Sequence, residues 1–157
     1  RNISKSEFCT IETAKVLLCY DSCMSITLEP DVTSFLLSAT SKALATISAD
    51  GSINVIPVSS IRVKDGRIVL VNYFMEKTLD NILAHPEVAL VAWKDMIGYQ
   101  IKGMAHYETS GMLFDEIVTW VNETIPGRVV KGIILITPTE LYDIAPDKKT
   151  KETYTAQ

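Results

Sequence analysis

The sequence lacks the features that mark nucleic-acid-binding and membrane-embedded proteins. Lysine and arginine number 15 against 19 acidic residues, so the formal net charge is -4, whereas nucleic-acid-binding domains usually carry a basic patch. No apolar run approaches the ~18 residues that a membrane-spanning helix needs, and no secretory signal is recognisable near the start. We therefore expect a cytoplasmic protein with no nucleic-acid partner and no membrane anchor.

Residues suited to acid–base or metal chemistry are also scarce. Of the two histidines, His85 precedes a proline at an expected helix end and His106 lies in an expected strand, so both are interpreted as structural. The sequence contains no HExxH, CxxC or GxSxG motif. We predict no metal site and no catalytic side chain, and we infer that a bound cofactor carries the chemistry.

The three cysteines, Cys9, Cys19 and Cys23, lie close together near the start. An odd, clustered set in a cytoplasmic protein is typical of reduced structural thiols, with a metal or redox role as the alternatives. We assign residues 1–28 to an N-terminal extension whose packing the sequence does not predict. Residues 29–145 are expected to form one domain, followed by a C-terminal tail at 146–157.

Hydrophobic periodicity predicts a mainly β domain with helices inserted singly. Strands are expected at 43–49, 52–60, 67–72, 88–93, 98–108 and 129–136, and helices at 30–40, 76–85 and 110–123. Asp50-Gly51 and Asp65-Gly66 indicate tight hairpin turns, and Pro57 marks an edge, a bulge or a point where a ligand meets the backbone. Without βαβ alternation or a GxGxxG motif, the order favours a closed or partly closed antiparallel barrel over a Rossmann fold.

Residues 71–81 contain the most informative local pattern. A buried strand ends at Asn72, and Lys77-Thr78 follows at the start of the expected helix. A helix N-terminus offers free N–H groups and the positive end of the helix dipole, to which lysine adds a full charge and threonine a hydroxyl donor. The pattern fits a phosphate clamp, and it equally fits a solvated Lys77 beside a helix-capping Thr78.

Several short motifs follow one another in a characteristic order. They are Asp50-Gly51, Pro57 with Ser59-Ser60, Asp65-Gly66, Lys77-Thr78-x-x-Asn81, His85-Pro86-x-Val88 and Ile101-x-Gly103-x-Ala105. Over residues 30–144 this order resembles the pyridoxamine 5′-phosphate oxidase-related family of FMN-binding split barrels, and especially its small FMN-binding proteins.

The resemblance implies a six-stranded antiparallel split β-barrel whose homodimer holds FMN at the subunit interface. It implies that Lys77 and Thr78 meet the phosphate, that the flavin edge lies along the strand after the first hairpin, and that Gln100 reaches the flavin from the partner subunit. The expected cofactor-binding residues are Ile56, Pro57, Val58, Ser59, Ser60, Val71, Asn72, Tyr73, Lys77, Thr78 and Gln100.

The residue types fit these roles but also fit simpler ones. A proline in mid-strand leaves neighbouring backbone groups free for the ring edge. Ser59 and Ser60 are small polar residues among apolar ones, and exposure to solvent would explain them, or Gln100, as well. Tyr73 and Phe74 are candidates to stack on the ring.

The resemblance leaves two main functions open. One is a flavin-dependent oxidoreductase that passes electrons from NAD(P)H to a small acceptor. The other is a non-catalytic FMN electron carrier, flavin store or sensor. Relatives with this barrel bind haem or deazaflavin instead, and haem would require His85 or His106 as a ligand. Residues 145–150 lack the arginine and histidine with which the family's oxidase holds pyridoxal phosphate, so we do not expect pyridoxamine phosphate oxidation.

Overall fold

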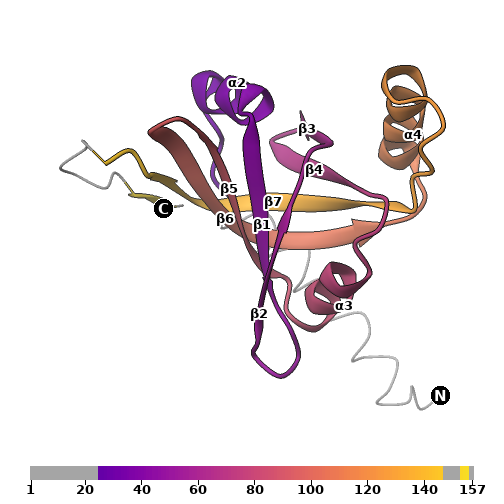
Figure 1. Cartoon of the computed structure of the whole chain (residues 1–157), viewed down its shortest axis with the longest axis horizontal. Coiled ribbons are helices and arrows are strands. Elements are labelled where there is room, and N and C mark those ends of the chain that lie inside the picture. Colours follow the sequence, from indigo (N-terminus) through magenta and orange to yellow (C-terminus); the bar gives the residue numbers. More distant parts are fainter. Residues whose placement is uncertain (1–24, 147–152, 156–157) are drawn as a thin grey trace, which may run out of the picture.

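The structure, a computed structural model, describes residues 25–146 and the backbone of 153–155. In this part of the chain, strands form one sheet and helices lie against it (Figure 1). The elements in order are α2 (Pro30–Ser38), β1 (Ser41–Ile47), β2 (Ile53–Pro57), β3 (Ile61–Lys64), β4 (Arg67–Asn72), α3 (Glu76–Ala84), β5 (Glu87–Lys94), β6 (Ile97–Glu108), α4 (Met112–Thr124), β7 (Gly132–Asp143) and β8 (Thr153–Thr155).

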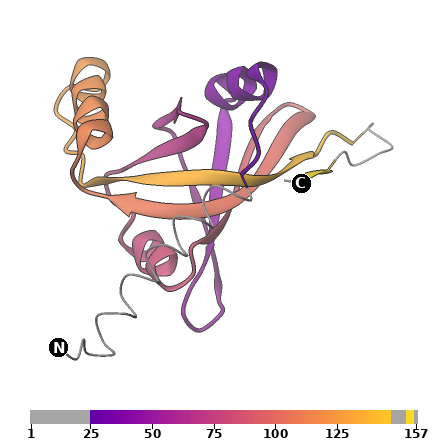
Figure 2. The ribbon, with the colours of Figure 1, turned by 180° about the vertical axis from the view of Figure 1, so that it is seen from behind.

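The antiparallel sheet runs in the order β2-β1-β5-β6-β7-β4-β3, and β8 pairs with β7. Its two outermost strands, β2 and β3, are consecutive in the chain, and only residues 58–60 separate them. Because this short link joins opposite edges, the sheet must curl on itself. Figures 1 and 2 show the result, with the β1–β2 hairpin crossing the long β6–β7 pair. The expected mainly β barrel with inserted helices is confirmed, with seven strands on this path instead of six.

Two details near the first hairpin differ from expectation. The strand predicted at 52–60 ends at Pro57, although the next amide, of Val58, still donates to the carbonyl of Lys42, its partner in the continued β1–β2 register, at 3.1 Å. The turn at Asp50-Gly51 is a five-residue loop in which only Gly51 has a positive φ, of 83°. The Asp50 carboxylate stabilises this loop by accepting the Ser52 N–H at 3.0 Å.

The second half of the chain also departs from the predicted boundaries. The last helix, expected at 110–123, begins at Met112 after Gly111 (φ 110°). The last strand, β7, continues through Pro138 because a register shift opposite Gly103 absorbs one residue. A Cβ on Gly103 would lie 2.3 Å from the Thr137 carbonyl oxygen, so the close approach of β6 and β7 at this position requires glycine.

Two apolar clusters hold the fold together. The first fills the curl of the sheet and includes Leu44, Leu90, Ile101 and Ile134. The second lies between α4 and the other face of β4 and β7, and consists of Val69, Val71, Tyr73, Ile117, Val121, Ile133 and Leu135. Since β4 is covered on both faces, its uninterrupted apolar sequence is explained. Among the helices described, none is long and apolar enough to cross a membrane.

Candidate functional site

A cavity of about 320 Å³ opens where the end of β2, the 58–60 link, the end of β4 and the start of α3 meet. The curl of the sheet brings these segments together, because the link that closes it also forms one wall. The lining residues are Asn54, Ile56, Pro57, Val58, Ser59, Ser60, Val71, Tyr73, Phe74, Met75, Glu76, Lys77 and Thr78. Every residue expected to bind the cofactor lines this cavity except Asn72 and Gln100.

The first turn of α3 forms one end of the cavity. Its N-cap residue, Met75, makes no side-chain capping bond, and the first helical hydrogen bond runs from the Leu79 N–H to the Met75 carbonyl at 2.9 Å. The amides of Glu76, Lys77 and Thr78 therefore have no carbonyl partner within the helix. Lys77 is exposed and forms no ion pair with any described residue. This end of the cavity combines free N–H groups with a full positive charge, an arrangement that favours an anion.

Thr78 is the third residue of the helix and not its cap, so the capping explanation of its hydroxyl is wrong. Thr78 lines the cavity, but only 1% of the residue is exposed. Its Oγ1 accepts a hydrogen bond from Asn54 Nδ2 at 3.4 Å. Behind it, Thr46 on β1 accepts from Asn81 Nδ2 at 2.9 Å and from Asn54 Nδ2 at 3.4 Å. A buried polar network thus joins α3 to β1 and β2.

Apolar and aromatic side chains form the opposite wall. The Tyr73 hydroxyl donates to Ser60 Oγ at 3.0 Å inside the protein, which fixes the ring, and the Val71 N–H donates to the Ser60 carbonyl at 3.1 Å. Ser60 is therefore a buried structural contact, while Ser59 is exposed at the mouth. The Phe74 ring is 76% exposed, which leaves a large apolar surface at the cavity rim.

Cations from the segment between α4 and β7 reach the same rim. The Arg128 guanidinium lies 5.2 Å from the centre of the Tyr73 ring, and Lys131 Nζ lies 5.8 Å from that of Phe74. Lys131 also pairs with Glu76 at 3.2 Å, so the carboxylate beside the α3 N-terminus is compensated. The charges that surround the cavity are therefore mainly positive.

The two remaining expected residues lie elsewhere. Asn72 uses both polar atoms internally: Oδ1 accepts from the Met75 N–H at 2.8 Å, and Nδ2 donates to the Tyr107 hydroxyl at 3.0 Å. Its position indicates that it holds the loop before α3. Gln100 lies on β6 opposite Val91 and Tyr142, outside the cavity of its own chain. Its contact with a partner's flavin stays a prediction.

Sequence reasoning missed three lining residues, Asn54, Met75 and Glu76, and it named Phe74 only as a candidate to stack on the ring. Met75 and Glu76 lie between Phe74 and Lys77, and the continuity of that stretch was a usable signal. Asn54 is a polar residue in the apolar run of β2, and it faces the cavity because the register sets it opposite Thr46. No local sequence motif indicates the pairing of Asn54 with Thr46.

Neither histidine lines the cavity, and the His106 side chain is 75% exposed, with Nε2 3.9 Å from Glu108. In residues 25–146 the structure contains no group of three or more histidine, cysteine, aspartate or glutamate side chains arranged to hold a metal ion. Cys9, Cys19 and Cys23 lie outside the described residues.

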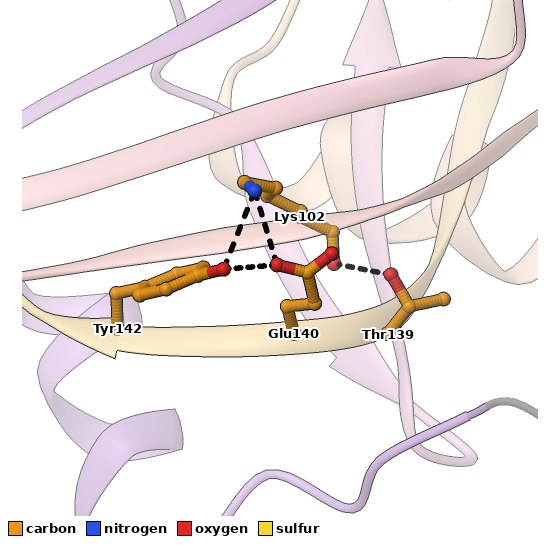
Figure 3. A network of polar contacts seen from close by, with 4 residues as sticks. All are labelled: Lys102, Thr139, Glu140 and Tyr142. Carbon is orange, nitrogen blue, oxygen red and sulfur yellow. Dashed lines mark hydrogen bonds and ion pairs between the residues drawn. The ribbon is translucent and has the colours of Figure 1, made fainter. Parts of the chain in front are cut away.

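A second polar cluster occupies β6 and β7, away from the cavity (Figure 3). Lys102 Nζ lies 3.0 Å from Glu140 Oε2 and 3.3 Å from the Tyr142 hydroxyl, which itself donates to Glu140. The hydrogen bond from Tyr142, followed by that from Lys102, holds the pKa of Glu140 below its ordinary value. Hydrogen bonding to Glu140 and then Tyr142 raises the pKa of Lys102. The cluster ties the two strands together beside the Thr139 bulge.

Comparisons with known proteins identify the class. Residues 28–150 match the pyridoxamine 5′-phosphate oxidase family. The uncharacterized protein MJ0282 of Methanocaldococcus jannaschii is 39% identical over 107 residues, which cover 64% of this chain and 70% of that protein. The chain belongs to the pyridoxamine 5′-phosphate oxidase family, as its motifs had suggested.

Solved structures share the fold at low sequence identity. An FMN-binding protein of Syntrophomonas wolfei superposes with a TM-score of 0.66 at 12% identity, covering 90% of this chain and 99% of that one. HutZ, the heme storage protein of Vibrio cholerae, superposes with a TM-score of 0.60 at 16% identity, covering 74% and 94%. An F420 reductase gives 0.57 at 17% identity, covering 73% and 98%. The fold is thus shared by proteins with different cofactors.

Proposed function

We propose that this protein binds FMN, with the phosphate at the N-terminus of α3 and the flavin ring against the wall formed by β2 and β4. The observation that carries the proposal is the pairing of an uncapped helix start with Lys77 at one end of the cavity. That end suits a phosphate dianion, and the apolar wall of Ile56, Val58 and Val71 suits a flat aromatic ring. The S. wolfei relative, named as FMN-binding, supports the same choice.

The flavin is expected to lie at the interface of a homodimer. The cavity is open, and large apolar side chains on β2 and α3 remain exposed in the single chain, at 76% for Ile53, 61% for Val55 and 73% for Leu83. A second subunit would bury this surface and shield the ring from water. In such a dimer Gln100 of each chain would reach the flavin of the other.

FMN would supply electron transfer, and the protein's residues would bind it, orient it and exclude water from it. We propose an oxidoreductase that takes electrons from NAD(P)H and passes them to a small acceptor, because no described side chain near the cavity offers other chemistry. A non-catalytic carrier, store or sensor is the alternative function of the same site. The absorbance spectrum with and without NAD(P)H separates the reductase from the non-catalytic protein, since only in the reductase should NAD(P)H bleach the flavin absorbance at a catalytic rate.

Lys77→Ala tests the phosphate assignment. Removal of a charge-assisted contact of about 1.5–3 kcal/mol should raise the FMN dissociation constant roughly 10- to 150-fold. Lys94→Ala is the matched control, because Lys94 is also an exposed lysine but lies outside the cavity. Flavin fluorescence titration measures both. Equal affinities in the two variants would contradict the phosphate assignment. A Soret band on addition of haem, with no uptake of FMN, would show that the ligand is haem and not FMN.

A further inference from the structure

We propose that Asn54 is a positioning residue that turns the Thr78 hydroxyl toward the ligand phosphate and thereby makes the site selective for a phosphorylated flavin. The proposal rests on the proposed function, because it assumes that the phosphate lies at the start of α3. It assigns a role to a residue on β2 that no local motif marks.

The direction of the hydrogen bonds follows from the chemistry of the amide. Asn54 Nδ2 carries two hydrogens and no lone pair to accept with, so it donates to both of its neighbours, Thr78 Oγ1 and Thr46 Oγ1, each at 3.4 Å. Thr78 is therefore the acceptor in this contact, and its own proton remains available. The structure gives that proton no acceptor among the described residues. The cavity that Thr78 lines is the direction left for it.

The rest of the network keeps Asn54 in this orientation. Thr46 and Asn54 are direct cross-strand partners in the β1–β2 register, and this pairing places the two side chains next to each other. Thr46 is 1% exposed and also accepts from Asn81 Nδ2 at 2.9 Å. Since Asn81 is one turn along α3 from Thr78, the same network fixes the helix that carries the hydroxyl.

The hydroxyl of Thr78 and the amide of Asn81 belong to buried residues. Thr78 and Asn81 are 1% and 3% exposed, so the hydrogen bonds that they receive from or donate to the network behind the cavity are shielded from water. A hydroxyl whose oxygen already accepts from a donor has its hydrogen left to donate to a second group. A phosphate oxygen at the α3 N-terminus would receive that hydrogen together with the free amides and the charge of Lys77. Riboflavin, which has no phosphate, would gain nothing from it.

The test compares FMN with riboflavin in the full-length protein. Asn54→Ala should raise the FMN dissociation constant by about 3- to 10-fold, the range for one hydrogen bond, and leave that of riboflavin within about 2-fold. Asn122→Ala, an exposed asparagine on α4, is the control and should change neither. Should Asn54→Ala fail to fold, Asn54→Val removes the amide while keeping β propensity, and the same comparison applies.

A double-mutant cycle with Thr78→Val separates positioning from direct contact. If Asn54 acts through Thr78, Asn54→Ala has no further effect on FMN affinity in the Thr78→Val background. An undiminished effect there would mean that Asn54 touches the phosphate itself, and equal losses for FMN and riboflavin would mean a structural role. Either result overturns the proposal.

The cycle also distinguishes this proposal from the one it rests on. Weakened FMN binding in Lys77→Ala and Thr78→Val, with no change in Asn54→Ala, would refute the positioning role and leave the phosphate site standing. Unchanged binding in all three variants would refute both.

Discussion

Replacement of Asn72 by alanine tests how the loop before α3 is held. Asn72 is 2% exposed, and its side chain accepts the Met75 N–H at 2.8 Å and donates to the Tyr107 hydroxyl at 3.0 Å. Asn72→Ala removes both bonds and leaves a half-buried amide without its acceptor. The Tyr107 hydroxyl keeps the Lys131 carbonyl, to which it donates at 3.2 Å. The unsatisfied Met75 N–H therefore accounts for the larger part of the loss in stability.

The magnitude follows from these contacts. A fully buried donor left unsatisfied costs about 1–3 kcal/mol, so the half-buried Met75 amide belongs at the low end of that range, and the second hydrogen bond contributes about 0.5–1.5 kcal/mol. We expect the free energy of unfolding to fall by about 1.5–3 kcal/mol, with a decrease in Tm of about 5–10 °C. Tyr107→Phe, which breaks only the bond to Asn72 Nδ2 and the one to Lys131, should cost less.

Urea denaturation followed by circular dichroism measures this loss. The protein concentration must be held constant, because the stability of the proposed dimer would depend on it. Asn122→Ala is again the control and should stay within about 0.5 kcal/mol of the wild type. A loss for Asn72→Ala no larger than that of the control would show that its two hydrogen bonds do not hold the loop, and the reasoning would be wrong.

Two further predictions concern the β6–β7 pair. Gly103→Ala should lower the free energy of unfolding by about 3 kcal/mol or prevent folding, because a Cβ would lie 2.3 Å from the Thr137 carbonyl oxygen; thermal melts that match the wild type would contradict this. The lowered pKa of Glu140 stabilises the fold above the carboxyl's ordinary pKa, and this stabilisation is lost as the pH falls through the folded-state pKa. Glu140→Gln should therefore flatten the acid limb of the stability profile, by no more than about 1 kcal/mol for so exposed a cluster, and an unchanged limb between pH 3 and 6 would refute the assignment.

Much of the fold was predictable because its signals are local. Asp65-Gly66 forms the expected turn with φ values of 49° and 74°, a conformation that depends on those two residues alone. The buried run of β4 and the amphipathic face of α4 were likewise legible from periodicity. The boundaries failed where distant contacts decided them, as at Pro138, where pairing with Gly103 carries β7 past a residue that looks like a strand end.

The candidate site divides in the same way. The sequence by itself determined that Lys77 and Thr78 stand at a helix start after a buried strand, because a strand, a loop and a helix in succession suffice for that. Only the tertiary structure decided what their neighbours are. Asn54 faces Thr78 because the β1–β2 register and the docking of α3 bring together residues 24 positions apart. Asn72 turns away from the cavity because Met75 and Tyr107 satisfy its side chain. Arg128 and Lys131 reach the rim because β7 pairs with β4 in a register that sets Gly132 opposite Asn72. Hydrogen bonds of this kind depend on positions in space, which the order of residues specifies only through the whole fold.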